Sequence, residues 1–320
     1  IERSKNFNIG INIYKDKKKA TISSNNIDAA DAKEYLEKGS AMVNSMPIDE
    51  YSGLADKKDY ASNIENLELE DKTYLSDKQL LDQALLAEDA MLKNKKITNS
   101  EGATRSFSKN TYSINNSQGF NAKYSKTFHS ISSIAIAGSA TNMQRDYEYS
   151  SATHANDLIL AAKVGSLAAQ RAVSRLNSKK IKSCTLDVIF EPRVAKSILS
   201  SFCSCASGTS IARGTSFLNN KLNSSIFRKN INITNNPKLK RGIGSAPYDS
   251  SGIKTKNISI IQDGVFKNLF LNIRSARQLR MAINGNSSPS NLILNKGDQD
   301  IETIIKNIKN GFLVTEMLGM

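Results

Sequence analysis

The chain has 320 residues, of which 39% are hydrophobic and 23% charged, and its formal net charge is +14. These values are ordinary for a globular protein and exclude a disordered chain, and no apolar run approaches the ~20 residues of a membrane-spanning helix. The length is sufficient for two domains, each with its own hydrophobic core.

The positive charge introduces a nucleic-acid-binding hypothesis, because clustered Lys and Arg gain free energy by releasing counterions from phosphate backbones. The clusters here are short and scattered, which favours a solvated basic surface, and nucleic acid is not an expected partner. They lie at residues 15–19, 93–96, 179–182 and 238–241.

The cysteine count and the N-terminal residues are informative about the cellular compartment. Cys184, Cys203 and Cys205 are too few, and odd in number, for a disulfide framework, which favours a reducing compartment, the cytoplasm. The first residues are polar, without a signal-peptide pattern or an initiator Met, so we expect the chain to be shortened at its front.

The first half of the chain predicts a sheet covered by helices. Isoleucines alternate at residues 9–13 and predict a half-buried strand, with a hairpin partner at 20–23. Asp28 is a candidate N-cap for a helix, and Ser76 opens a capping box for a second helix.

A β-meander is expected at residues 103–137, with a turn at 116–119. Residues 142–149 read as a polar crossing, and an Ala-rich helix follows at 157–177. These elements predict an antiparallel sheet with helices on one side, an α+β layer. Residues 178–183 read as a linker, so we expect an N-terminal α+β domain at 1–177 and a second domain at 178–320.

The second domain begins with a short apolar strand at residues 186–190 and a helix opened by Pro192 and stopped by Gly208. Further strands are expected at 231–234, 258–271 (a hairpin) and 291–294, and a last helix at 300–309. The expected fold class is therefore α+β, with a mainly β, barrel-like and incomplete C-terminal domain.

Four ordered segments carry a family resemblance: residues 186–217, Arg-Gly-Ile-Gly-Ser-Ala-Pro-Tyr-Asp at 241–249, Arg-Ser-Ala-Arg at 274–277, and Leu-Val-Thr-Glu-Met-Leu-Gly at 313–319. Together they make the chain resemble the PmbA (TldE) branch of the TldD/PmbA family of bacterial peptidases, collinearly from end to end. Family members continue beyond the last of these motifs, so the resemblance implies a chain that is short at both ends.

In that family the TldD-type subunit carries His-Glu-x-x-x-His on the helix after the strand at 186–190. Two imidazoles bind zinc there and the Glu acts as general base. Here Ser200 and Ser201 stand at the His-Glu positions and Cys205 at the second His, and no His follows His154. The resemblance thus implies a subunit without metal, cofactor or catalytic residues, whose partner is a zinc-containing TldD-type catalytic subunit. The heterodimer would hydrolyse small, unfolded or modified peptides.

Other polar groups are weaker site candidates. The Gly, Ser and Thr-rich loop with Arg213, Gly214 and Thr215 could cradle an anion, and the resemblance places it in a chamber wall beside the subunit-pairing surface. Arg274 and Arg277 are three residues apart and can share a helical face, where they could bind a substrate carboxylate or form structural ion pairs.

Three alternatives remain open at this point. The chain could be a stand-alone metalloprotease whose zinc site uses His129, His154 and a cysteine. It could be a non-enzymatic regulator or nucleic-acid binder that uses its positive charge, or a degraded gene product that folds poorly. Neither a Cys203 and Cys205 hook nor a serine nucleophile is favoured, because the two thiols diverge by roughly 200° on a helix and the serines have no adjacent base.

Overall fold

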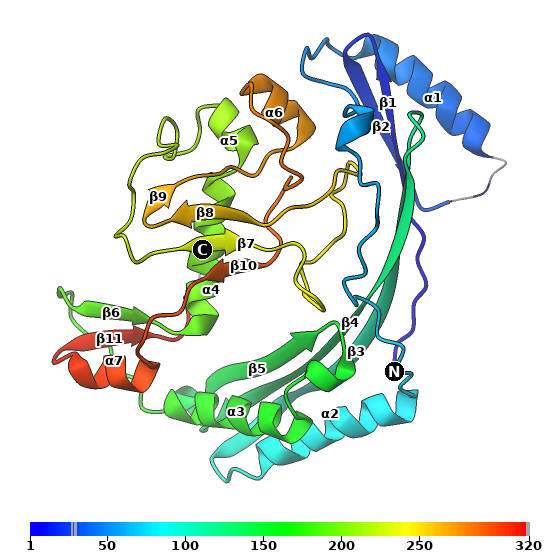
Figure 1. Cartoon of the computed structure of the whole chain (residues 1–320). Coiled ribbons are helices and arrows are strands. Elements are labelled where there is room, and N and C mark those ends of the chain that lie inside the picture. The colour runs from blue at the N-terminus through cyan, green and yellow to red at the C-terminus, as the bar shows by residue number, and fades with distance from the viewer. Residues whose placement is uncertain (27, 29–30, 318–320) are drawn as a thin grey trace.

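The first half of the chain is built on a long antiparallel sheet, seen in a computed structural model that describes residues 1–26, 28 and 31–317 (Figure 1). Strands β3 (Ile97–Asn115), β4 (Asn121–Ala137) and β5 (Gln144–Ala152) pair in that order. Helices α2 (Asp77–Leu92) and α3 (Ala161–Ser174) cover one face (Figure 1). The predicted helix-backed antiparallel sheet is confirmed.

Strand β4 shows why this sequence makes a strand with two unlike faces. From Thr127 to Ala137 every second residue is buried, and the residues between them, Ile134 and Ile136 included, are half-buried on the opposite face. Successive side chains of a strand point to opposite faces, so the pattern follows from the pleat. Apart from Ile131, the buried positions hold small or polar residues, and this lets the helices pack close to the sheet.

The two covering helices touch backbone to backbone. A Cβ atom at Gly165 of α3 would lie 1.8 Å from the carbonyl oxygen of Ala87 in α2. Helix α2 begins at the predicted capping box, in which Ser76 and Gln79 each accept from the other's backbone N–H. Small residues on α3 therefore set the distance between the helices.

Strand β5 corrects one expectation, because residues 142–149 were read as a polar crossing. The strand pairs with β4 over residues 144–152, and its inward positions include Asp146 and Ser150. The missing hydrophobic alternation has a physical cause: the buried carboxylate of Asp146 is neutralised by arginines of two helices.

A small unit stands at the far end of the β3–β4 hairpin (Figure 1). Strands β1 (Ile9–Lys15) and β2 (Lys18–Ser24) form the predicted hairpin, and α1 (Ala32–Ser45) packs on it. The N-cap of α1 is Asp31 rather than Asp28. Short 3₁₀ turns also lie in this half, at Lys57–Asp59, Ala140–Asn142 and Ala155–Asp157.

The second half combines short strands with helices. Strands β10 (Leu292–Leu294), β7 (Ile233–Asn235), β8 (Ile258–Gln262) and β9 (Val265–Phe266) form one antiparallel sheet in that order. Strand β6 (Asp187–Phe190) pairs in parallel with β11 (Gly311–Val314). The helices are α4 (Pro192–Cys205), α5 (Gly208–Ala212), α6 (Ile273–Gln278) and α7 (Ile301–Asn307).

The α+β class is confirmed, although the second half is less regular than expected. Its described strands form open sheets and no closed barrel, and its longest helix exceeds every one of its strands. The core of this half gathers Cys203, Leu218, Ile260, Phe266 and Phe270. Among the described residues no helix combines the length and apolarity needed to cross a bilayer.

Candidate functional site

Helix α4 carries the positions at which the family resemblance puts a zinc motif. Pro192 occupies its first turn, as predicted, and Val194 and Cys203 are buried on its inner face. Ser200 and Ser201 are exposed, and Cys205 is half-buried. The two serines therefore face outward, whereas Cys205 packs against the edge of the core.

The donors on α4 do not fit zinc. Zinc sites in proteins use imidazole, thiolate and carboxylate ligands, usually three or four of them. Here the motif positions offer two neutral hydroxyls and one thiol, and no three His, Cys, Asp or Glu side chains gather at one point within the described residues. No hydrolytic step can be assigned to these groups.

The cysteines of α4 serve packing. Cys203 is fully buried in the core of the second half, and burial raises the pKa of its thiol to about 12. The carbonyl of Cys205 accepts from the Ser216 hydroxyl at 2.7 Å. A neutral, buried thiol behaves as a small apolar side chain.

The two histidines lie in the first half, away from α4 in the chain. His129 of β4 is fully buried, with Nδ1 3.3 Å from a guanidinium nitrogen of Arg105 and Nε2 3.3 Å from the Asp71 carboxylate. Burial and the Arg105 charge lower its pKa, against the opposing effect of the Asp71 charge. His154 is half-buried and contacts the Thr153 hydroxyl at 3.2 Å.

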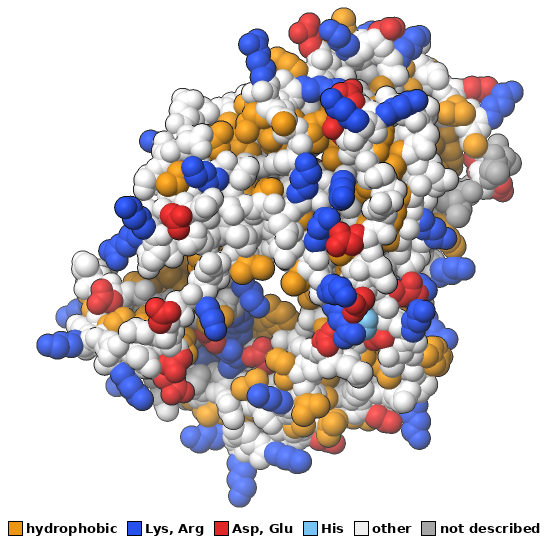
Figure 2. All heavy atoms as spheres, in the orientation of Figure 1, with side chains coloured by type: hydrophobic (Ala, Val, Ile, Leu, Met, Phe, Trp, Pro, Cys, Tyr) orange, Lys and Arg blue, Asp and Glu red, His pale blue; other side chains and the backbone are white. Residues whose placement is uncertain are grey.

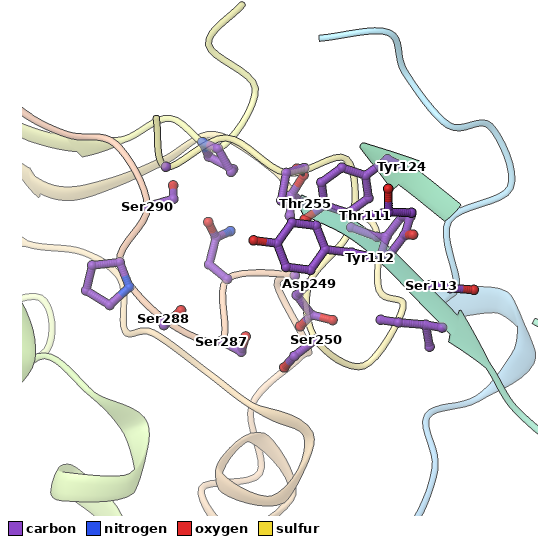
Figure 3. Close-up of a pocket in the computed structure, with 18 of the residues that line it drawn as sticks. Thr111, Tyr112, Ser113, Tyr124, Asp249, Ser250, Thr255, Ser287, Ser288 and Ser290 are labelled. Carbon is purple, nitrogen blue, oxygen red and sulfur yellow. Dashed lines mark hydrogen bonds between the residues drawn. The ribbon is translucent and has the colours of Figure 1, made fainter. Parts of the chain in front are cut away.

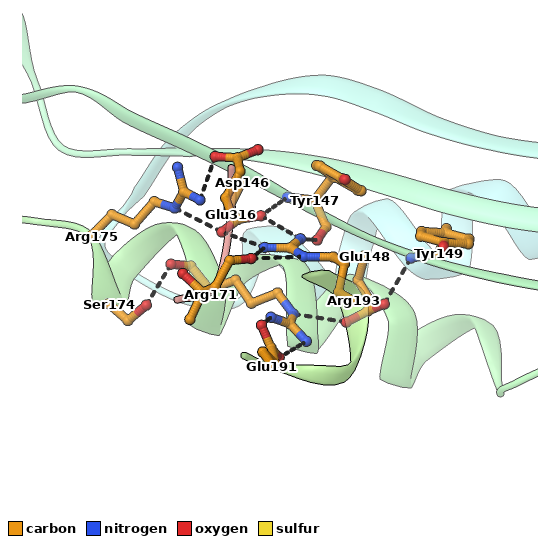
Figure 4. A network of polar contacts seen from close by, with 11 residues as sticks. Asp146, Tyr147, Glu148, Tyr149, Arg171, Ser174, Arg175, Glu191, Arg193 and Glu316 are labelled. Atoms are coloured by element: carbon orange, nitrogen blue, oxygen red, sulfur yellow. Dashed lines mark hydrogen bonds and ion pairs between the residues drawn. The ribbon is translucent and has the colours of Figure 1, made fainter. Parts of the chain in front are cut away.

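A buried ionic network holds the start of α4 against the first half (Figure 4). Asp146 of β5 is 3% exposed and lies 2.8 Å from both Arg175, the C-cap of α3, and Arg193 of α4. Burial alone would raise the pKa of Asp146, but the hydrogen bond from Arg193 and the two positive charges bring it below its usual value. The carboxylate therefore stays ionised and joins three elements.

The network continues on both sides of Asp146 (Figure 4). Arg171 of α3 lies 2.8 Å from Glu148 and 2.7 Å from Glu191, and these hydrogen bonds raise its pKa. Arg175 also contacts Glu316 at 2.6 Å. Glu316 belongs to the motif at 313–319, so this motif closes the junction; its Leu318 and Gly319 lie outside the described residues.

The weaker candidates fall at the ends of α5 and α6. Arg213, Gly214 and Thr215 are exposed just after α5, and Gly214 has a φ of +70°. On α6, Arg274 pairs with Asp49 at 2.6 Å, and Arg277 donates to the Leu54 carbonyl at 2.6 Å. Both arginines thus hold the connection after α1, whereas no described side chain binds the Arg213 guanidinium through an ion pair.

Basic side chains do not form one continuous surface on the face shown in Figure 2, where they alternate with acidic and uncharged ones. The run at 238–241 is partly neutralised by acidic residues. Lys238 lies 2.6 Å from Glu65, and Lys240 lies 2.6 Å from Glu68.

Two family models together match most of the chain. A family model described as the PmbA/TldA metallopeptidase central domain matches residues 54–176, and the corresponding C-terminal domain model matches 183–320. A metalloprotease PmbA homolog of Buchnera aphidicola from Acyrthosiphon pisum is 30% identical over 97% of this chain and 70% of its own length. The chain belongs to the TldD/PmbA family.

Other members of the TldD/PmbA family are similar to this chain over most of its length. A second Buchnera aphidicola PmbA homolog, from Baizongia pistaciae, is 32% identical over 85% of this chain and 61% of its own length. Metalloprotease PmbA of Escherichia coli O157:H7 is 29% identical over 97% of this chain and 70% of its own length. The chain thus spans between 61% and 70% of these curated relatives.

Solved structures show the same fold. A crystal structure from Bacteroides thetaiotaomicron superposes with a TM-score of 0.90 at 26% identity, covering 96% of this chain and 71% of its own. TldE from Thermococcus kodakarensis superposes with a TM-score of 0.81 at 20% identity, covering 97% of this chain and 73% of its own. At the latter identity the likeness concerns the fold alone.

The ionic network was not predicted from the sequence. Its members are spread from residue 146 to residue 316, and each is an ordinary charged residue. The one available signal was an acidic residue at an inward position of a strand, and it could be recognised only once β5 was assigned as a strand.

Proposed function

We propose that this chain is the non-catalytic, PmbA-type subunit of a heterodimeric zinc metallopeptidase of the TldD/PmbA family. In this proposal a TldD-type partner holds the zinc and hydrolyses small, unfolded peptides. The observation that carries it is the surface of α4. Ser200, Ser201 and Cys205 present hydroxyls and a thiol where the family resemblance expects two imidazoles and a general base.

The way α4 is held supports a subunit that needs no metal of its own. Arg193 fixes the first turn to Asp146, and Cys203 packs the last turn into the core. Metal sites often supply folding free energy, but this helix has protein partners at both ends. Its outer face is then free to close the chamber of a partner subunit and to limit access to extended peptides.

The proposal also includes a domain boundary and a cellular compartment. We assign the boundary between the two domains to 177/178, because residues 178–183 separate the last helix of the first half from β6. We also assign the complex to the cytoplasm, since Cys184, Cys203 and Cys205 are free thiols.

The test is hydrolysis of an unfolded peptide by this chain, by a TldD-type partner, and by their mixture, each with and without a zinc chelator. The proposal expects chelator-sensitive hydrolysis in the mixture that exceeds the partner alone, and none with this chain alone. The triple variant Ser200→Ala, Ser201→Ala, Cys205→Ala should leave the activity of the mixture unchanged, because these side chains perform no chemistry.

The alternatives give different outcomes. Chelator-sensitive hydrolysis by this chain alone would establish a stand-alone metalloprotease and refute the proposal. Retention on nucleic acid that weakens steeply with salt, without any effect on hydrolysis in the mixture, would favour a nucleic-acid binder.

A further inference from the structure

A cavity of about 500 Å³ lies between the tip of the β3–β4 hairpin and two loops of the second half (Figure 3). The hairpin contributes residues 111–114 and Tyr124, and the loops contribute residues near 244–255 and 285–290. This volume is typical of a pocket for a small ligand. None of the site candidates on α4, α5 or α6 lines it, so the cavity is a separate feature.

The lining is polar but almost uncharged. Hydroxyls come from both sides, among them Thr111, Ser113 and Ser287 (Figure 3). Asp249 is the one ionisable acid or base, apart from tyrosines, among the described lining residues, although the chain as a whole carries a net charge of +14. A chain this basic could easily have lined an anion site with Lys or Arg. The absence of both from the described lining disfavours an anionic ligand.

Three tyrosines form the aromatic part of the wall. The rings of Tyr112 and Tyr124 stack with centroids 5.1 Å apart, and Tyr248 meets Tyr124 edge to face at 5.3 Å. Tyr248 is 2% exposed, and its hydroxyl has no hydrogen-bond partner among the described residues. Buried polar atoms in native proteins nearly always have a partner. This hydroxyl therefore points to a ligand group that supplies one.

Asp249 is held by the backbone of its own loop. One carboxylate oxygen, Oδ1, accepts from the backbone N–H groups of Ser251 at 2.9 Å and Ile253 at 3.0 Å. No described Lys, Arg or His forms an ion pair with this carboxylate. Burial raises the pKa of Asp249, against the lowering effect of these hydrogen bonds and of the Ser287 side chain. A bound cation would reverse that cost.

We propose that this cavity binds a primary ammonium group of a peptide, either its amino terminus or a lysine side chain. Asp249 acts as the counter-ion, the Tyr248 oxygen accepts a hydrogen bond from the ammonium, and the exposed ring of Tyr112 supplies cation–π attraction. Carboxylates pair strongly with ammonium donors, and aromatic walls are a recurrent way to hold such cations. That the ligand is a peptide rests on the proposed function. That the bound group is an ammonium follows from the residues that line the cavity.

The test is calorimetric titration of the whole chain, without any partner subunit, with three short peptides. One has a free amino terminus and no lysine, one is N-acetylated and contains lysine, and one is N-acetylated without lysine. At least one of the first two should bind at least tenfold more tightly than the third. Which one binds identifies the source of the ammonium.

Two variants and one control localise the binding. Asp249→Asn keeps the Oδ1 acceptor for the loop N–H groups, so the loop is retained, and binding should weaken at least tenfold. Tyr248→Phe keeps the ring and removes the unpaired hydroxyl, and binding should weaken severalfold. Asp263→Asn makes the same charge change in the exposed β8–β9 turn and should have no effect. Circular dichroism checks that each variant is folded.

Equal affinity for all three peptides, or no binding of any peptide to the folded chain at millimolar concentration, would overturn the inference. An Asp249→Asn variant that binds like Asp263→Asn would overturn it as well. Since the titration contains no partner subunit, its result is independent of hydrolysis. Ammonium binding without any effect on peptide hydrolysis in the mixture would refute the proposed function and leave this site standing.

Discussion

Replacing Gly165 by Ala should destabilise the protein, even though alanine is the better helix former. Gly165 lies in α3 where it touches the backbone of α2, and its Cβ would be 1.8 Å from the Ala87 carbonyl oxygen. Real Cβ atoms essentially never come closer than 3.0 Å, so the helices must separate by more than 1 Å. Because the contact is with backbone, no side-chain rotation can relieve it.

Two opposing effects set the magnitude. Alanine is favoured over glycine inside a helix by about 1 kcal/mol. Overpacking of a close contact costs about 1 to 3 kcal/mol, and the upper end applies here because Ala168, Ala169 and Ala172 of the same helix are at most 1% exposed and would lose contacts with the sheet. The expected net loss in the free energy of unfolding is about 2 kcal/mol.

The measurement is urea unfolding followed by far-ultraviolet circular dichroism, with Gly39→Ala as the matched control. Gly39 is also helical, but its Cβ would meet the Cδ1 atom of Ile13 at 2.1 Å, the end of a side chain that can rotate away. Gly39→Ala should therefore stay within about 1 kcal/mol of the parent protein. If Gly165→Ala were as stable as the control, the close approach of α2 and α3 would be refuted.

Two further predictions concern buried carboxylates. Asp146→Asn leaves Arg175 and Arg193 without their shared counter-ion and should lower the free energy of unfolding by about 3 kcal/mol; a urea midpoint equal to that of the parent would contradict the network. Burial opposes ionisation of Asp71, but N–H donors at Ala155 and Thr73 lower its pKa to about 2. Because folding lowers the pKa of Asp71, the ionised carboxylate contributes about 2 kcal/mol to the free energy of unfolding above about pH 4. This contribution is lost as the pH falls through about 2. Asp71→Asn should reduce the dependence of the free energy of unfolding on pH between about pH 2 and pH 4. If the variant and the parent protein had the same pH dependence, Asp71 would not have the lowered pKa.

Local signals in the sequence were sufficient for several elements. The capping box at Ser76 and the first-turn proline at Pro192 each act within one helical turn, and both are confirmed. The hairpin at residues 258–271 is also confirmed, with a turn at Asp263 and Gly264, both at positive φ. Such features depend on neighbours in the chain, which is why they can be predicted.

Elements that depend on distant partners were missed. Strand β5 is polar because Asp146 meets arginines from two helices, and the β6–β11 pairing joins residues more than a hundred positions apart. Gly208 was expected to stop α4, yet the helix ends at Cys205 and Gly208 opens α5, packed against Leu271 and the Phe270 carbonyl. A glycine signals close approach as readily as a helix end.

The site was predictable only in part. The sequence predicted a helix at the position of α4 and an absence of zinc ligands on it; the helix is confirmed, and the role of Ser200, Ser201 and Cys205 stays a prediction. The division at 177/178 likewise stays a prediction. The motif at 241–249 supplies part of the cavity wall, but the cavity itself could not be predicted, because Tyr112 and Ser287 come together only through the fold.

The parallel pairing of β6 with β11 has a consequence for the order in which the protein folds. Residues 187–190 are synthesised long before residues 311–314, and a parallel pair cannot form until its second strand exists. During translation the apolar segment with Val188 and Phe190 therefore has no strand partner until residues 311–314 are made. The sheet of the first half can already be complete by then. Contacts of such long sequence separation form slowly, and exposed strand edges associate with other chains in the meantime. Residues 187–190 are thus a segment of this protein at which a nascent-chain chaperone has time to act.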